Sequence, residues 1–305
     1  MRAPMKTVCS FAIAVAALFF CSTTARAQAS DLTLNQMDQA HLDALAALTA
    51  KKIREAKPSG GPPKVLVFDF FRGSPGTSSQ LGTLLADRFS ELLSGYATGM
   101  KILDRKTLKD YLTENWTTLE DLRSNEVCFR LAGQLGASGA ILGTLAEKDG
   151  KIDLMLHLEG FGPKEKEDDI FAWRDRTVSF SLTEELHAAL FQSGPNYSRK
   201  SEDIPEEPGV FRHGEPGVTA PQCEYCPDPE FSDAARAVKF QGKVVLSVVV
   251  NVDGHVSGIF VLKGAPFGLT TQSINATKNW RFKPGQKDGR PVPVRLDVET
   301  TFSLL

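Results

Sequence analysis

The stretch KVVLSVVVNVDGHVSGIFVLK, residues 243–263, contains two apolar runs on either side of Asp253-Gly254. Valine, isoleucine and phenylalanine favour strands, and Asp-Gly between two such runs is a strong signal for a two-residue β-hairpin loop. We therefore predict antiparallel strands over residues 243–252 and 256–264, joined at Asp253 and Gly254.

Two helices and a third strand are expected around this hairpin. The segments PEFSDAARAVKF (229–240) and GLTTQSINATKNW (268–280) have helical character, and PVPVRLDVETTFSLL (291–305) alternates as a strand does. Its two faces would carry Val292, Val294, Leu296, Val298, Thr300 and Phe302 on one side and Arg295, Asp297, Glu299, Thr301 and Ser303 on the other. Residues 221–305 therefore read as a small helix–strand–strand–helix–strand domain with a three-stranded antiparallel sheet.

The segment NWRFKPGQKDGRPVPV, residues 279–294, combines aromatic and basic residues. It could be a surface for an anion or a nucleic acid, or it could be a helix end, a turn and a strand start around a core anchor. We interpret Trp280 and Phe282 as core anchors, because the basic excess after residue 228 is mild for nucleic-acid binding. Pro291 and Pro293 would enter the last strand, where a missing N–H is tolerated at a sheet edge.

These features together resemble the TonB C-terminal domain family over residues 221–305. The resemblance implies a non-enzymatic periplasmic domain without a cofactor. It also implies that the domain binds the TonB box, a short extended segment of outer-membrane TonB-dependent transporters, as an energy transducer does in transmembrane and protein transport. The positions that carry the family signature are Ala235, Arg236, Gly242, Asp253, Gly254, Trp280, Phe282, Pro284, Gly289 and Pro291.

The family binds its partner by strand addition beside its last strand. A strand at a sheet edge offers unpaired N–H and C=O groups to an incoming chain. Carried over to this sequence, the resemblance places the partner-binding strand at Arg295, Leu296, Asp297, Val298, Glu299, Thr300, Thr301 and Phe302.

A second domain is expected over residues 64–193, after a helix and a short linker at 28–63. Apolar strands such as KVLVFDF (64–70) alternate with amphipathic helices, which predicts an α/β sandwich. Asp69, after an apolar strand, could be an acid in a cleft, but we interpret it as a turn residue at the strand end. The segment is similar to the N-terminal domains of TolB-like and CsgG-like envelope proteins, which implies contacts with other envelope proteins. Residues 194–220, rich in proline, glycine and acids, are read as a linker, so the whole chain is α+β.

The first 27 residues have the pattern of a secretory signal. Basic Arg2 and Lys6 precede the apolar run FAIAVAALFF, and small residues suited to cleavage follow at Ala25 to Ala27. Cleavage predicts a periplasmic protein. The alternatives are an uncleaved inner-membrane anchor and, more weakly, lipidation at Cys21.

Cys223 and Cys226 lie in the proline-broken loop PQCEYCPDPE, 221–230. A redox pair usually opens a helix after a strand, and a structural zinc site usually needs four ligands. A local disulfide is therefore favoured over thiol redox chemistry or metal binding. We find no catalytic motif, metal-ligand spacing or phosphate-binding glycine loop, and we expect no enzymatic activity, small-molecule substrate or nucleic-acid partner.

Overall fold

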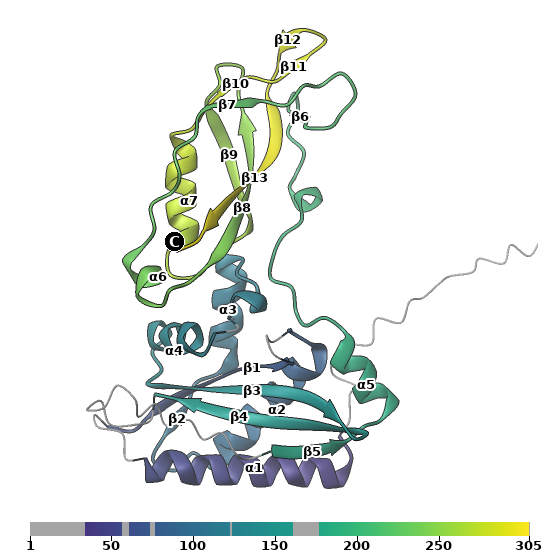
Figure 1. The fold of residues 1–305 in the computed structure, drawn as a ribbon, viewed down its shortest axis with the longest axis vertical. Coiled ribbons are helices and arrows are strands. Elements are labelled where there is room, and N and C mark those ends of the chain that lie inside the picture. Colours follow the sequence, from purple (N-terminus) through teal and green to yellow (C-terminus); the bar gives the residue numbers. More distant parts are fainter. Residues whose placement is uncertain (1–33, 57–60, 74–76, 123, 161–176, 305) are drawn as a thin grey trace, which may run out of the picture. The chain divides into compact units, whose positions relative to one another are not determined.

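The computed structural model describes residues 34–56, 61–73, 77–122, 124–160 and 177–304. The expected export signal at residues 1–27, including Cys21, lies outside this described part. The described chain is a mixed α+β structure with an N-terminal α/β region and a β-rich C-terminal region (Figure 1), which confirms the predicted fold class.

The N-terminal sheet has five strands in the order β2-β1-β3-β4-β5. β1 pairs in parallel with β2 and β3, whereas the β3–β4 and β4–β5 pairs are antiparallel. The β3–β4 hairpin turns at Asp149 and Gly150, both with positive φ, as an Asp-Gly loop favours. The strands are β1 (Lys64–Arg72), β2 (Lys101–Ile102), β3 (Gly139–Lys148), β4 (Lys151–Glu159) and β5 (Thr177–Ser181).

Helices cover both faces of this sheet because β1 is apolar on both sides. Val65 and Val67 pack with buried residues of α1 and α2, whereas Leu66 and Phe68 pack with those of α3 and α4. Figure 1 shows α1 along one face and α3 and α4 on the other. The helices are α1 (Gln36–Glu55), α2 (Gln80–Gly95), α3 (Arg105–Asn115), η2 (Leu119–Leu122), α4 (Asn125–Gln134) and α5 (Glu184–Phe191).

A buried charge network joins β1, α2 and α3. The Arg105 guanidinium, 4% exposed, donates to Asp69 at 2.5 Å, to Asp87 at 2.6 Å and to the Val67 carbonyl at 2.6 Å. Asp69 lies inside β1 and is 3% exposed, so its expected place in a turn at the strand end is wrong. The sequence pattern shows an acid near an apolar run, but the buried arginine that neutralises it is 36 residues away.

The C-terminal sheet has four strands in the order β6-β13-β8-β9. The β13–β8 and β8–β9 pairs are antiparallel, so the three predicted strands are confirmed, and β6 adds a fourth that is parallel to β13. β13 and β8 pair without a register shift from Val294↔Val250 to Phe302↔Gly242. The strands are β6 (Phe211–Arg212), β8 (Gly242–Val250), β9 (Val256–Lys263) and β13 (Val294–Phe302).

The loop between β8 and β9 is longer than the predicted two-residue turn, so that prediction is wrong. The Gly254 N–H donates to the Asn251 carbonyl at 2.9 Å, and the Asn251 N–H donates to the His255 carbonyl at 2.9 Å. Gly254 has φ +80° and its carbonyl accepts the N–H of Phe282, a residue of strand β10 (Arg281–Lys283). This tertiary contact, which the local sequence does not encode, fixes the wider loop.

Shorter elements complete the C-terminal region. Helix α7 packs against β8 and β9, and the β11–β12 hairpin turns at Asp288 and Gly289, both with positive φ. The remaining elements are η3 (Ser201–Asp203), β7 (Gln222–Tyr225), α6 (Asp233–Ala237), α7 (Leu269–Lys278), β10 (Arg281–Lys283), β11 (Gln286–Lys287) and β12 (Arg290–Pro291).

Candidate partner-binding edge

The side chains of β13 alternate between the two faces of the C-terminal sheet. Leu296 and Val298 are partly buried, Phe302 is buried, and the Thr300 hydroxyl lies 2.8 Å from that of Ser273 on α7. Asp297, Glu299 and Thr301 are exposed. These positions follow the predicted alternation, because one face packs against α7.

The backbone of β13 has two different edges. One edge pairs with β8 along the whole strand, whereas on the other β6 pairs with Val294 and Arg295 alone. The Arg295 carbonyl accepts the His213 N–H on this second edge. Since backbone groups of alternate residues point to the same edge, the N–H and C=O groups of Asp297, Glu299 and Thr301 also point there. No strand within the described residues pairs with these three, and we call them the open edge.

The proline directly before β13 fits the same geometry. Pro293 has the same parity as Arg295, so its missing N–H falls on the side of the open edge rather than on the side of β8. The Pro293 carbonyl accepts the Phe211 N–H at 3.0 Å, so it contacts β6 on that side. A proline is tolerated there because no ladder bond to β8 is lost. Pro291 lies in β12 and pairs with Gln286 of β11, so its expected place in the last strand is wrong.

Arg295 differs from Asp297, Glu299 and Thr301, which lie on the same face of β13, because it is buried, at 4% exposure. Its guanidinium donates to the Pro205 carbonyl at 2.8 Å and to the Glu207 carboxylate at 2.6 Å. It also lies 5.5 Å from the ring centre of Phe260. The alternation predicts which face of the sheet the Arg295 side chain lies on. It does not predict the burial, because Glu207 and Pro205, which bind the guanidinium, are 88 and 90 positions earlier in the chain.

The acidic side chains beside the open edge have partners of their own. Glu299 forms an exposed ion pair with Lys243 at 2.7 Å, and Asp297 accepts a hydrogen bond from the Ser201 hydroxyl at 3.2 Å. Exposed ion pairs contribute little to stability. The backbone groups of the open edge, which have no strand partner among the described residues, lie beside these side chains.

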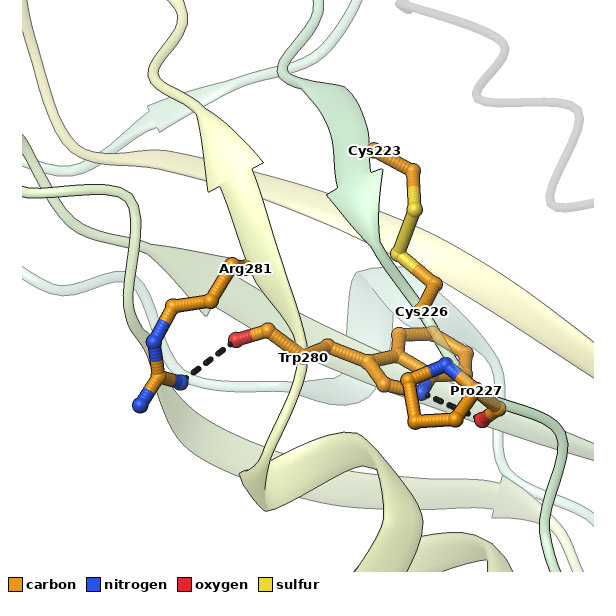
Figure 2. The surroundings of a disulfide bond; sticks show 5 residues. All are labelled: Cys223, Cys226, Pro227, Trp280 and Arg281. Carbon is orange, nitrogen blue, oxygen red and sulfur yellow. Dashed lines mark hydrogen bonds between the residues drawn. A yellow bond between two sulfur atoms is a disulfide. The ribbon is translucent and has the colours of Figure 1, made fainter.

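Trp280 and Phe282 are both buried, and Leu296 and Val298 of β13 pack against their cluster. Figure 2 shows the Trp280 indole N–H directed at the Pro227 carbonyl, 2.9 Å away. Beside it the structure joins Cys223 and Cys226 in a disulfide, and Phe282 pairs with Cys223 between β10 and β7. The aromatic pair packs in a buried cluster with Val250, as expected of core anchors.

The other signature positions shape backbone and packing. A Cβ at Gly254 would lie 2.0 Å from the Phe282 carbonyl oxygen, and one at Gly242 would lie 2.6 Å from the Phe240 ring. Ala235 is buried, and the Arg236 guanidinium lies 5.4 Å from the centre of the Phe231 ring. Pro284 follows β10, while Gly289 and Pro291 lie in the β11–β12 hairpin.

Metal ligands and free thiols can be located among the described residues. Among them there is no group of three or more His, Cys, Asp or Glu side chains that could hold a metal ion. Cys128 is buried, and burial raises the pKa of its thiol well above the usual value. In the part of the chain that the structure describes, no helix is both long and apolar enough to span a bilayer.

An α+β domain whose last strand has one edge without a strand partner has a surface to which an extended peptide can add. Residues 227–304 match the family of the Gram-negative bacterial TonB protein C-terminal. The chain therefore carries a TonB C-terminal domain in this segment, as the sequence predicted.

Solved structures similar to parts of this chain include a TonB C-terminal domain, an LpoB C-terminal domain and a lipoprotein. The TonB C-terminal domain of Pseudomonas aeruginosa is 18% identical, with a TM-score of 0.24 over 30% of this chain and 92% of that one. The LpoB C-terminal domain of Salmonella enterica is 10% identical, with a TM-score of 0.34 over 46% of this chain and 98% of that one. Lipoprotein GNA1162 of Neisseria meningitidis is 15% identical, with a TM-score of 0.29 over 41% and 84%. No curated protein matches the chain.

Proposed function

We propose that this chain is a non-enzymatic periplasmic protein that binds extended segments of outer-membrane TonB-dependent transporters by β-strand addition. The observation that carries the proposal is the open edge, where the backbone groups of Asp297, Glu299 and Thr301 lack a strand partner within the described residues. An incoming strand would satisfy these groups and extend the C-terminal sheet. The TonB C-terminal domain at residues 227–304 supports the choice of partner.

The N-terminal α/β region would position this module or dock to other envelope proteins. Two alternatives keep the same C-terminal domain. If the signal stays uncleaved, the chain is an inner-membrane-anchored energy transducer, and mass determination of the mature N-terminus separates this from the exported form. If no peptide binds, the domain has a structural role in the envelope.

Site-specific photocrosslinking tests the proposal. A photoreactive residue at position 299, on the open edge, should form adducts with synthetic peptides from the periplasmic N-terminal segments of TonB-dependent transporters. The same residue at Val252, which is 53% exposed in the β8–β9 loop, is the matched control and should form none. Equal labelling at both positions, or none at 299, contradicts strand addition at this edge.

A further inference from the structure

Residues 201–213, expected to be part of a linker without structure of its own, lie on the C-terminal sheet. We call them the cover segment. It contains the short helix η3 and strand β6, and its Ile204 side chain is 1% exposed. The segment also contacts β13 directly, through β6, through the Ser201 hydroxyl on Asp297 and through the Pro205 carbonyl on Arg295, so it packs on its own domain.

The cover segment uses the same edge of β13 that would receive a partner. The Phe211 N–H donates to the Pro293 carbonyl at 3.0 Å, and the His213 N–H donates to the Arg295 carbonyl at 2.9 Å. Phe211 and Arg212 pair in register with Val294 and Arg295. Strand addition from within the chain therefore already occupies the start of this edge.

A second set of contacts holds the cover segment to the outer face of the sheet. The buried Arg295 guanidinium binds the Pro205 carbonyl and the Glu207 carboxylate. Arg212 donates from within the segment to the carbonyls of Ser201 and Ile204, at 3.3 and 3.4 Å, and so braces its bend. These contacts should nevertheless bind the cover segment only weakly, because β6 is two residues long and the Glu207 side chain is 44% exposed.

We propose that the cover segment is an autoinhibitory strand: it blocks Val294 and Arg295, and a partner that pairs along the whole of β13 must displace it. The identity of that partner rests on the proposed function above. A tethered segment competes at an effective concentration in the millimolar range, so its release should strengthen partner binding without any new contact.

The test removes one bond of the cover segment in the full chain. His213→Pro deletes the N–H that reaches Arg295, whereas His213→Ala keeps that N–H and is the matched control. Two fluorescein-labelled peptides are titrated by anisotropy. One is drawn from transporter N-terminal segments, and the other is the chain's own residues 199–218, RKSEDIPEEPGVFRHGEPGV. We expect His213→Pro to bind both about tenfold more tightly than wild type, the scale of one lost backbone bond, and His213→Ala to bind as wild type does.

Equal affinity of wild type and His213→Pro for the chain's own peptide would overturn the proposal. Stronger binding of that peptide to His213→Pro, together with no binding of transporter peptides to any form, would uphold autoinhibition and reject the proposed partner. Glu207→Gln, which loosens the cap on Arg295 without changing the backbone, should act in the same direction by a smaller factor. If His213→Pro fails to fold, the peptide affinity of Glu207→Gln tests autoinhibition in its place.

Discussion

The His213 N–H donates to the Arg295 carbonyl at 2.9 Å, and within the described residues this is the last backbone bond on the outer edge of β13. The bond shows which residues of β13 direct their backbone N–H and C=O groups to the edge away from β8. Because Arg295 faces that edge, so do Asp297, Glu299 and Thr301, whereas the backbone groups of Val298 and Thr300 face β8. Substitutions at neighbouring positions of one strand should therefore have different consequences.

Substitutions at Gly254 and Gly289 can be compared to test the contact between the β8–β9 loop and β10. Both have positive φ, +80° and +78°, so alanine at either position carries a similar backbone strain of about 1–2 kcal/mol. A Cβ at Gly254 would also meet the Phe282 carbonyl oxygen, whereas nothing lies within 4 Å of one at Gly289. Urea unfolding should show Gly254→Ala to be the more destabilising by more than about 1 kcal/mol. Equal losses would mean that the β8–β9 loop does not contact β10 as described.

Removal of Arg105 should destabilise the N-terminal region strongly. Arg105→Met would leave the carboxylate of Asp69 buried without its cation, a change that typically costs about 3–5 kcal/mol. Asp87 pairs with Arg105 and also with Lys109, whose side chain is 37% exposed. Lys109→Ala removes only this second, exposed cation and should lower the free energy of unfolding by no more than about 1 kcal/mol. Denaturant unfolding of both variants measures the difference. A loss below about 1 kcal/mol for Arg105→Met would contradict a tightly buried pair.

The same network predicts a pH dependence. Burial opposes ionisation of Asp87, but Arg105 and Lys109 outweigh it and lower the pKa of that carboxyl below 3.8. A lowered folded pKa means that the ionised carboxylate stabilises the fold above the unfolded pKa, and that this contribution is lost as the pH falls through the folded pKa. The stability difference between wild type and Asp87→Asn should therefore be full at pH 7 and shrink below about pH 4. A difference that grows on acidification would contradict a lowered pKa of Asp87 in the folded state.

Removal of the disulfide between Cys223 and Cys226 tests whether these cysteines have a structural or a redox role. It closes a short loop beside Trp280, and in the chain-entropy account such a loop adds about 2 kcal/mol or less. Paired Cys→Ser changes should lower the free energy of unfolding by up to that amount and leave peptide binding within about twofold, since neither residue lies on β13. Catalysis of insulin reduction by the wild type, lost in the variant, would instead indicate an oxidoreductase.

Much of the C-terminal domain could be predicted because its signals are local. The alternation from Val294 to Phe302 gives both the strand and its buried face, and Asp288-Gly289 gives the turn before it. The position of the hairpin at Asp253-Gly254 was also predictable, but its loop length was not, because the Gly254 carbonyl binds a residue of β10 far along the chain.

The cover segment and the burial of Arg295 could not be predicted for the same reason. A two-residue parallel strand such as β6 has no periodicity to detect, and its partners lie more than 80 residues later. The cap on Arg295 depends on Glu207, which in the sequence is one of several acids in a proline-rich stretch. Tertiary contacts alone distinguish it from the others.

Glu299→Pro tests most directly whether partners bind to the backbone of the open edge. This change removes an N–H that faces outward and leaves the bonds to β8, whereas Val298→Pro would break the ladder and the fold with it. Glu299→Ala keeps the N–H and removes the carboxylate. Calorimetric titration with a transporter-derived peptide should show a loss of about 1–3 kcal/mol for Glu299→Pro and nearly unchanged binding for Glu299→Ala. If a folded Glu299→Pro variant binds as tightly as wild type, strand addition at this edge is contradicted.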